Sequence, residues 1–217
     1  MTSLIGVGRN MKCFKAKLLI DNQVYSVVAK HHISKRCPLE QYQRQAQSYV
    51  HAEAAIESFK ADVLYYPKFT ALDKELAKKL RIAKCWVVQK VGTKAQVDDA
   101  TDSDFWLFEE ELDGKFVKYM GNDNFINKHS CTPIYQMIHA LAHHDLQENG
   151  GRSFVCDLQG GGATLTDPAV NDLDKTFGSG NLNYEGLRLM IDQHRENQWC
   201  RNFGLDNMEK FKRQLEL

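Results

Sequence analysis

Val155-Cys156-Asp157-Leu158-Gln159-Gly160 and, after four intervening residues, Leu165-Thr166-Asp167-Pro168 bring the side-chain oxygens of Asp157, Gln159 and Asp167 close together in the sequence. The first segment is apolar until it reaches Asp157, which predicts a carboxylate at the end of a buried strand. Such a carboxylate is costly unless it is paired or bound to a cation. The spacing of Asp157, Gln159 and Asp167 therefore fits a site for a hard divalent cation such as Mg²⁺. It fits ordinary turn chemistry equally well, since Asp and Gly also populate turns.

The composition indicates one globular, cytosolic protein. The 217 residues are 43% hydrophobic and 26% charged, and their 28 basic and 28 acidic side chains cancel. Nothing in this balance favours nucleic acid or an anionic membrane as a partner. The sequence shows neither a signal peptide nor an apolar run long enough for a membrane span. The cysteines are scattered and are expected to be reduced thiols: Cys13, Cys37, Cys85, Cys131, Cys156 and Cys200.

The first half of the chain is predicted to be rich in strands. Periodicity predicts strands over 11–20 and 23–30, joined by a tight turn at Asp21-Asn22, and further strands over 82–91 and 105–108. A long helix is expected from Pro38 to about residue 62, and a short one over 71–80 with Thr70 as its cap. Residues 92–103 are polar and are predicted to form a loop.

The second half is predicted to be mainly helical. Helices are expected over 133–147, 184–194 and 206–217, with a buried strand over 154–158. Glu109 to Gly114 form the best candidate for a hinge. The pattern predicts an α+β protein with two lobes.

Three further groups of residues can carry chemistry. Lys30 ends an apolar strand, where it can contact phosphates or simply face solvent. The Phe177–Asn181 loop precedes a helix and can offer backbone amides to an anion, although such loops often bind nothing. His143, His194 and Cys200 can ligate a structural zinc ion, or be two satisfied histidines and a buried thiol.

Six motifs occur in one order along the chain: Val28-Ala29-Lys30; Glu109 followed by Gly114, Lys118-Tyr119 and Asn122; Asp157-Leu158-Gln159-Gly160; Thr166-Asp167-Pro168; Phe177-Gly178-Ser179-Gly180-Asn181-Leu182 with Gly186; and Cys200 to Gly204-Leu205. Together they resemble the α-kinase family, the atypical protein kinases that include elongation factor 2 kinase, myosin heavy chain kinase and channel-fused kinase domains. The segment from Gly8 to Phe14 loosely resembles the family's phosphate-covering turn.

The resemblance implies a single catalytic domain over residues 1–217. Its strand-rich N-lobe would span about 1–107, its hinge about 108–114 and its more helical C-lobe, with a zinc site, about 115–217. The implied activity is transfer of the γ-phosphate of ATP to serine or threonine in a protein substrate. Lys30 would hold the α- and β-phosphates, and Glu109 would contact adenine. Asn181 would serve the peptide or the nucleotide.

The same resemblance assigns the remaining site residues. Gln159 and Asp167 would hold Mg²⁺, and Asp157 would orient the acceptor hydroxyl or act as base. The family's zinc set has two histidines and two cysteines, of which His143, His194 and Cys200 are present. Glu196 stands where the second cysteine is expected, so the zinc set would be His143, His194, Glu196 and Cys200.

Other departures leave alternatives open. Glu110 replaces a hinge proline, Asn183 replaces a glycine, and Gln45 stands where the long helix should carry an acidic residue. A pseudokinase that binds nucleotide without turnover is the first alternative, and a zinc-stabilised interaction domain is the second. The sequence does not indicate the substrate, the regulation or the oligomeric state.

Overall fold

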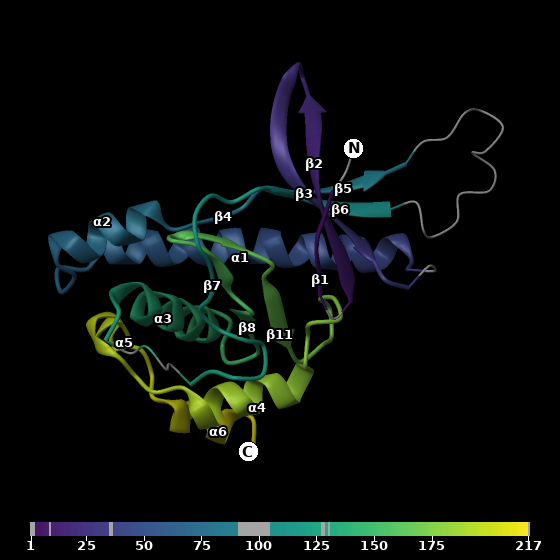
Figure 1. Cartoon of the computed structure of the whole chain (residues 1–217). Coiled ribbons are helices and arrows are strands. Elements are labelled where there is room, and N and C mark those ends of the chain that lie inside the picture. The colour runs from purple at the N-terminus through teal and green to yellow at the C-terminus, as the bar shows by residue number, and fades with distance from the viewer. Residues whose placement is uncertain are drawn as a thin grey trace.

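Figure 1 shows the computed structural model of the chain, which describes residues 3–8, 10–34, 37–90, 105–126, 129 and 131–216. A strand-rich part lies above the long helix α1 (Leu39–Tyr65), and a helix-rich part lies below it. The predicted two-lobed α+β architecture is therefore confirmed. The polar loop predicted over 92–103 lies outside the described residues.

The upper lobe contains a five-stranded antiparallel sheet in the order β1-β2-β3-β6-β5. Its strands are β1 (Ser3–Val7), β2 (Met11–Ile20), β3 (Gln23–His32), β6 (Phe105–Glu110) and β5 (Cys85–Gln89). Asp21 and Asn22 have φ values of 49° and 63°. Two positive φ values match a two-residue turn whose twist suits a hairpin, as their sequence predicted.

Helix α1 packs between the lobes because one of its faces is apolar over its whole length. The buried side chains recur every three or four residues and include Tyr42, Tyr49, Ile56, Phe59 and Val63. The helix ends just before Pro67, which cannot continue it. Helix α2 (Ala71–Lys79) follows, and Thr70 caps it in a reciprocal arrangement with Asp73, which confirms the predicted cap.

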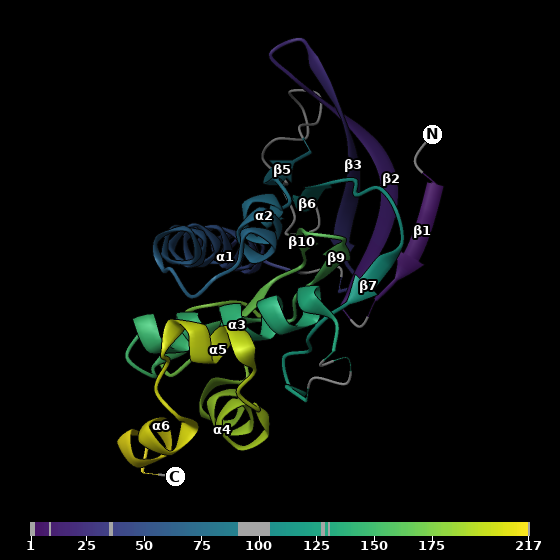
Figure 2. The same cartoon turned by 90° about the vertical axis from the view of Figure 1, so that its left-hand side faces the viewer.

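A small four-stranded sheet joins the lobes, in the order β4-β10-β9-β7. Figure 2 shows β10 (Thr164–Thr166), β9 (Gln159–Gly161) and β7 (Phe116–Lys118) between the upper sheet and the lower helices. The fourth strand, β4 (Arg81–Ile82), runs parallel to β10. The single strand predicted over 82–91 was wrong, because the chain leaves β4 and enters the upper sheet as β5.

Strand β9 requires glycine at position 160, which lies opposite Leu165 of β10. Its φ is 158°, and a Cβ atom there would lie 2.0 Å from the carbonyl oxygen of Thr164. No other residue allows the two strands to approach so closely. This approach places Gln159 directly opposite Thr166.

The lower lobe packs helices around a two-stranded ribbon. Its elements are α3 (Pro133–Glu148), β8 (Ser153–Cys156), β11 (Ala169–Asp172), α4 (Asn183–Gln193), α5 (Gln198–Phe203) and α6 (Met208–Gln214). Phe154, Val155 and Leu158 are fully buried in its core, on either side of Asp157. In the part of the chain that the structure describes, no helix combines the length and hydropathy needed to cross a bilayer.

Candidate active site

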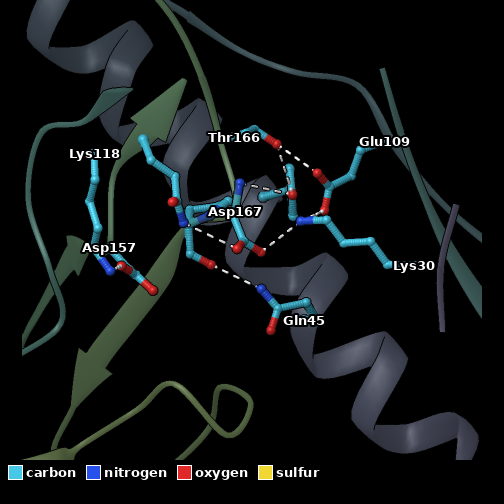
Figure 3. Close-up of polar contacts among 10 residues, drawn as sticks. Lys30, Gln45, Glu109, Lys118, Asp157, Thr166 and Asp167 are labelled. Atoms are coloured by element: carbon cyan, nitrogen blue, oxygen red, sulfur yellow. Dashed lines mark hydrogen bonds and ion pairs between the residues drawn. The ribbon is translucent and has the colours of Figure 1, made fainter. Parts of the chain in front are cut away.

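Lys30 lies near the end of β3, and its ammonium group is held between two carboxylates (Figure 3). Its Nζ atom is 2.6 Å from Glu109 and 3.0 Å from Asp167. Burial opposes the charge, but the two carboxylates, Glu109 first, raise the pKa of Lys30 above its usual value. Lys30 therefore keeps a positive charge at the junction of the two lobes.

Glu109 comes from β6, the strand next to β3, where it pairs with Val28. Its carboxylate is 3% exposed, and its second oxygen accepts a hydrogen bond of 2.8 Å from the hydroxyl of Thr166. The resemblance assigned Glu109 to adenine, but the structure directs its side chain to Lys30 and Thr166. Lys30 thus obtains its buried acidic partner from β6, the neighbouring strand.

Asp167 follows β10 and has a left-handed backbone conformation with φ of 55°. The hydroxyl of Tyr49 in α1 accepts a hydrogen bond of 3.0 Å from the Asp167 amide and lies 3.2 Å from the Thr166 hydroxyl. Burial raises the pKa of Tyr49 well above its usual value, so the hydroxyl keeps its proton. One tyrosine therefore fixes the backbone that carries Asp167.

Gln159 meets Asp167 because their strands are paired. The Gln159 amide donates a hydrogen bond of 3.1 Å to the second Asp167 oxygen. Gln45 in α1, which stands where an acidic residue was expected, donates to the Pro168 carbonyl at 3.0 Å and supports the same turn. A carboxylate and a carboxamide at one turn are oxygen ligands of the kind that Mg²⁺ takes, so these residues fit the predicted ion.

Asp157 stands just beyond β8, and in Figure 3 it lies on the other side of Asp167 from Lys30. Its φ is 51°, and its amide donates to the Gly121 carbonyl at 3.1 Å. Burial raises the pKa of Asp157, although the ammonium of Lys118, 2.6 Å away, opposes that effect. The carboxylate is thus positioned by its backbone and by Lys118, a residue to which the sequence gave no role.

Asn181 has a structural position in the loop before α4. Its side-chain oxygen accepts from the amides of Asp172 and Asn183, and its side-chain nitrogen donates to the Asp172 carboxylate. These contacts bind the loop to β11. The side chain that was assigned to nucleotide or peptide binding is therefore occupied within the chain.

A second group of polar side chains lies inside the lower lobe. The ligand atoms of His143, His194 and Cys200 all lie within 4.8 Å of one another, as the sequence predicted, and all three residues are buried. Such a set suits zinc. Glu196, the fourth predicted ligand, is exposed and does not belong to this group, because it lies on the turn between α4 and α5 with its side chain in solvent.

The other departures have local explanations. Glu110 forms a two-bond pair with Arg81, at 2.8 Å for each bond, and its amide donates to the Lys84 carbonyl, which a proline could not do. Strand β6 continues to Glu110, and the Glu111 amide still donates to the Ser26 carbonyl of β3 at 3.0 Å, so the connection to the lower lobe leaves the sheet after Glu111.

Asn183 has φ of 57°, a conformation that asparagine tolerates better than most residues.

Sequence reasoning missed two residues that hold the site together. Tyr49 was assigned only to the apolar stripe of the long helix, and Thr166 only to a motif. A tyrosine on a buried stripe carries a hydroxyl that needs a partner, and that need was the available signal. Its partner could not be named without the fold.

A strand lysine paired with a buried glutamate, facing an Asp and a Gln at the junction of two lobes, resembles the phosphotransfer site of protein kinases. The family model of the α-kinases matches residues 6–200 of this chain. The chain belongs to the α-kinase family.

Known proteins agree with this assignment. The chain is 31% identical over 134 residues to the elongation factor 2 kinase of Caenorhabditis elegans, which covers 61% of this chain and 16% of the relative. It is 30% identical over 111 residues to the human kinase of the same name, covering 51% and 15%. The chain thus spans about a sixth of the length of these curated relatives.

The fold is shared with solved α-kinase structures. An α-kinase from Entamoeba histolytica superposes with a TM-score of 0.74 at 22% identity, covering 94% of this chain and 77% of the other. The α-kinase domain of myosin heavy chain kinase A, in complex with ADP, gives a TM-score of 0.72 at 19% identity, covering 94% and 86%. At these identities the likeness concerns the fold.

Proposed function

We propose that this protein is an ATP-dependent serine/threonine protein kinase, with the whole chain as one catalytic domain. The observation that carries the proposal is the joining of Lys30, Glu109, Gln159 and Asp167 by ion pairs and hydrogen bonds at the lobe junction, with Asp157 on their far side. Phosphoryl transfer needs mainly positioning and charge stabilisation, which this set can supply.

Lys30 would hold the phosphates of ATP. Its charge is permanent, and its 2.6 Å pair with Glu109 fixes the direction of the side chain. Phosphate oxygens can replace Asp167 as its second partner while Glu109 stays in place. Contact of the adenine with the connection around Glu109 would involve the backbone, because the carboxylate is already occupied.

Gln159 and Asp167 would hold Mg²⁺ through their side-chain oxygens. The ion, when bound, neutralises charge that develops on the transferred phosphoryl group. Asp157 would accept a hydrogen bond from the substrate hydroxyl and take up its proton. The raised pKa of Asp157 makes it a better base than an exposed aspartate.

Zinc would be held in the lower lobe by His143, His194 and Cys200. The Nδ1 atoms of both histidines are buried and have no hydrogen-bond partner. Unpaired buried acceptors are costly, so a cation that accepts their lone pairs fits this position. The role of such an ion would be structural, since it would be bound in the core of the lower lobe, away from Asp157.

The partner would be a protein substrate, and the compartment the cytoplasm. All six cysteines are free thiols, which suits a reducing environment. The names of the relatives include kinases of elongation factor 2 and of myosin heavy chain, both of them proteins.

The test is phosphate transfer from labelled ATP to a basic protein substrate in the presence of Mg²⁺. Wild type is expected to transfer phosphate, and D157A to lose at least ~100-fold in rate. Equal and negligible transfer by both proteins refutes the kinase proposal. In that case, strong thermal stabilisation by ATP with Mg²⁺ would identify a nucleotide-binding module without turnover.

A further inference from the structure

His139 is a buried histidine that the kinase site does not use. It lies on α3 four residues, about one turn, before His143, so the two side chains share one helix face. A pair of histidines four residues apart on a helix is a recurrent zinc-binding arrangement. The zinc site proposed above lacks a fourth ligand, because Glu196 points into solvent.

The hydrogen bonds of His139 leave one nitrogen free. The side chain is 2% exposed, and its Nε2 atom is buried with no partner. The ring is hydrogen-bonded to the backbone of Tyr119, which leaves Nδ1 as the bonded atom. A carbonyl oxygen can only accept, so Nδ1 carries the proton and Nε2 keeps its lone pair. This is the tautomer that a metal ligand requires.

His143 is held in the complementary way. Its Nε2 atom donates to the carbonyl of Asp206 at 2.8 Å, so Nδ1 keeps the lone pair and has no partner. Metal-bound histidines usually make such an outer contact, which fixes the orientation of the ring. Both histidines of α3 therefore present an unprotonated nitrogen inside the same core.

The positions of the other two groups complete the set. The ring centroid of His194 lies 4.8 Å from that of His143 and 6.4 Å from that of His139, and its Nε2 is 3.5 Å from the Cys200 sulfur. The nitrogen atoms of His139 do not lie within the 4.8 Å that joins the ligand atoms of His143, His194 and Cys200, so its ring must move toward the group to bind the ion. Cys200 would bind as thiolate and release its proton to solvent.

We infer that the Nε2 atom of His139 is the fourth ligand of this zinc site, in place of the residue at position 196. The inference rests on the proposed zinc site, and goes beyond it by naming a set of three histidines and one cysteine. It requires no kinase activity, so the two can fail separately.

The experiment measures zinc content and zinc affinity, by mass spectrometry and by competition with a chelating dye. Wild type is expected to hold one zinc ion per chain, and H139Q to bind it at least ~100-fold more weakly, since even outer contacts of zinc ligands contribute 10–100-fold. Two control variants should stay within about threefold of wild type. E196Q changes the exposed glutamate, and H144Q changes an equally buried neighbour that bonds Asp62 instead.

A second variant separates ligation from folding. H139C places a thiol at the same position, and its cobalt(II) form should show stronger near-ultraviolet thiolate-to-metal absorption than the wild-type cobalt form. Zinc affinity that H139Q leaves intact, or an equal loss in E196Q or H144Q, would each overturn the inference. A wild-type protein without zinc overturns both the inference and the zinc site, while leaving the kinase proposal standing.

Discussion

The ion pair of Lys30 and Glu109 offers the sharpest test of the site's electrostatics, through the variants K30M, E109Q and K30M/E109Q. Glu109 is 3% exposed, and its carboxylate lies 2.6 Å from the ammonium group of Lys30. K30M therefore leaves a buried charge without its counter-ion, which costs about 3–5 kcal/mol of unfolding free energy. E109Q should cost less, about 2 kcal/mol, because Lys30 keeps Asp167 at 3.0 Å.

The double variant removes both charges, so it should lose less than the sum of the single variants. We expect a coupling energy of about 2 kcal/mol, measured by urea unfolding at neutral pH with unchanged slopes. The raised pKa of Lys30 keeps the ion pair charged at neutral pH. The stability that the pair contributes is fully present below the pKa of lysine in the unfolded chain, and it is lost only as pH rises through the pKa of Lys30 in the folded protein. Additive losses within about 0.5 kcal/mol, or an E109Q more damaging than K30M, would refute this account.

Three other perturbations follow from the geometry. D157N should abolish phosphate transfer and raise the free energy of unfolding at neutral pH. Because the folded-state pKa of Asp157 is raised, its negative charge lowers stability once pH rises through the unfolded and then the folded pKa. A melting temperature below that of wild type would contradict this account. G186A should lose about 1–3 kcal/mol of unfolding free energy, because a Cβ atom at position 186 would lie 2.3 Å from Asn171. The control variant G8A, whose Cβ atom would lie 3.6 Å from its nearest neighbour, should keep the stability of wild type in the same urea series. N183G should gain up to about 1 kcal/mol of unfolding free energy and N183A should lose a similar amount, because the φ of 57° at this position favours glycine. Equal melting temperatures for the two variants would show that this backbone carries no strain.

The sequence predicted the parts of the fold that follow from local pattern. The hairpin at Asp21-Asn22, the cap at Thr70 and the long helix are encoded by residues that lie close together in the chain, and all three were found. The break at Ala83-Lys84 was missed, because nothing local distinguishes one long strand from two that belong to different sheets. Only the pairing of β4 with β10, about 80 residues away, separates them.

The site was predicted unevenly for the same reason. Gln159 and Asp167 are near neighbours in sequence, and their meeting was expected. The partnership of Glu109 with Lys30 links residues far apart in the chain, so the sequence pattern did not predict it, and the family resemblance implied a contact with adenine instead. Likewise Glu196 was chosen by its place in a motif, whereas the burial that decides a metal ligand is a property of the folded lobe.

Helix α1 is bonded to both lobes along its whole length. At its start the Tyr42 hydroxyl accepts from the His32 amide of the upper sheet, and near its end Asp62 bonds His144 of the lower lobe. Between them Tyr49 holds the Asp167 turn. Its 27 residues extend over about 40 Å. Because α1 contacts both lobes, a nucleotide bound at Lys30 should stabilise residues along the whole helix. It should slow amide hydrogen exchange as far away as Asp62.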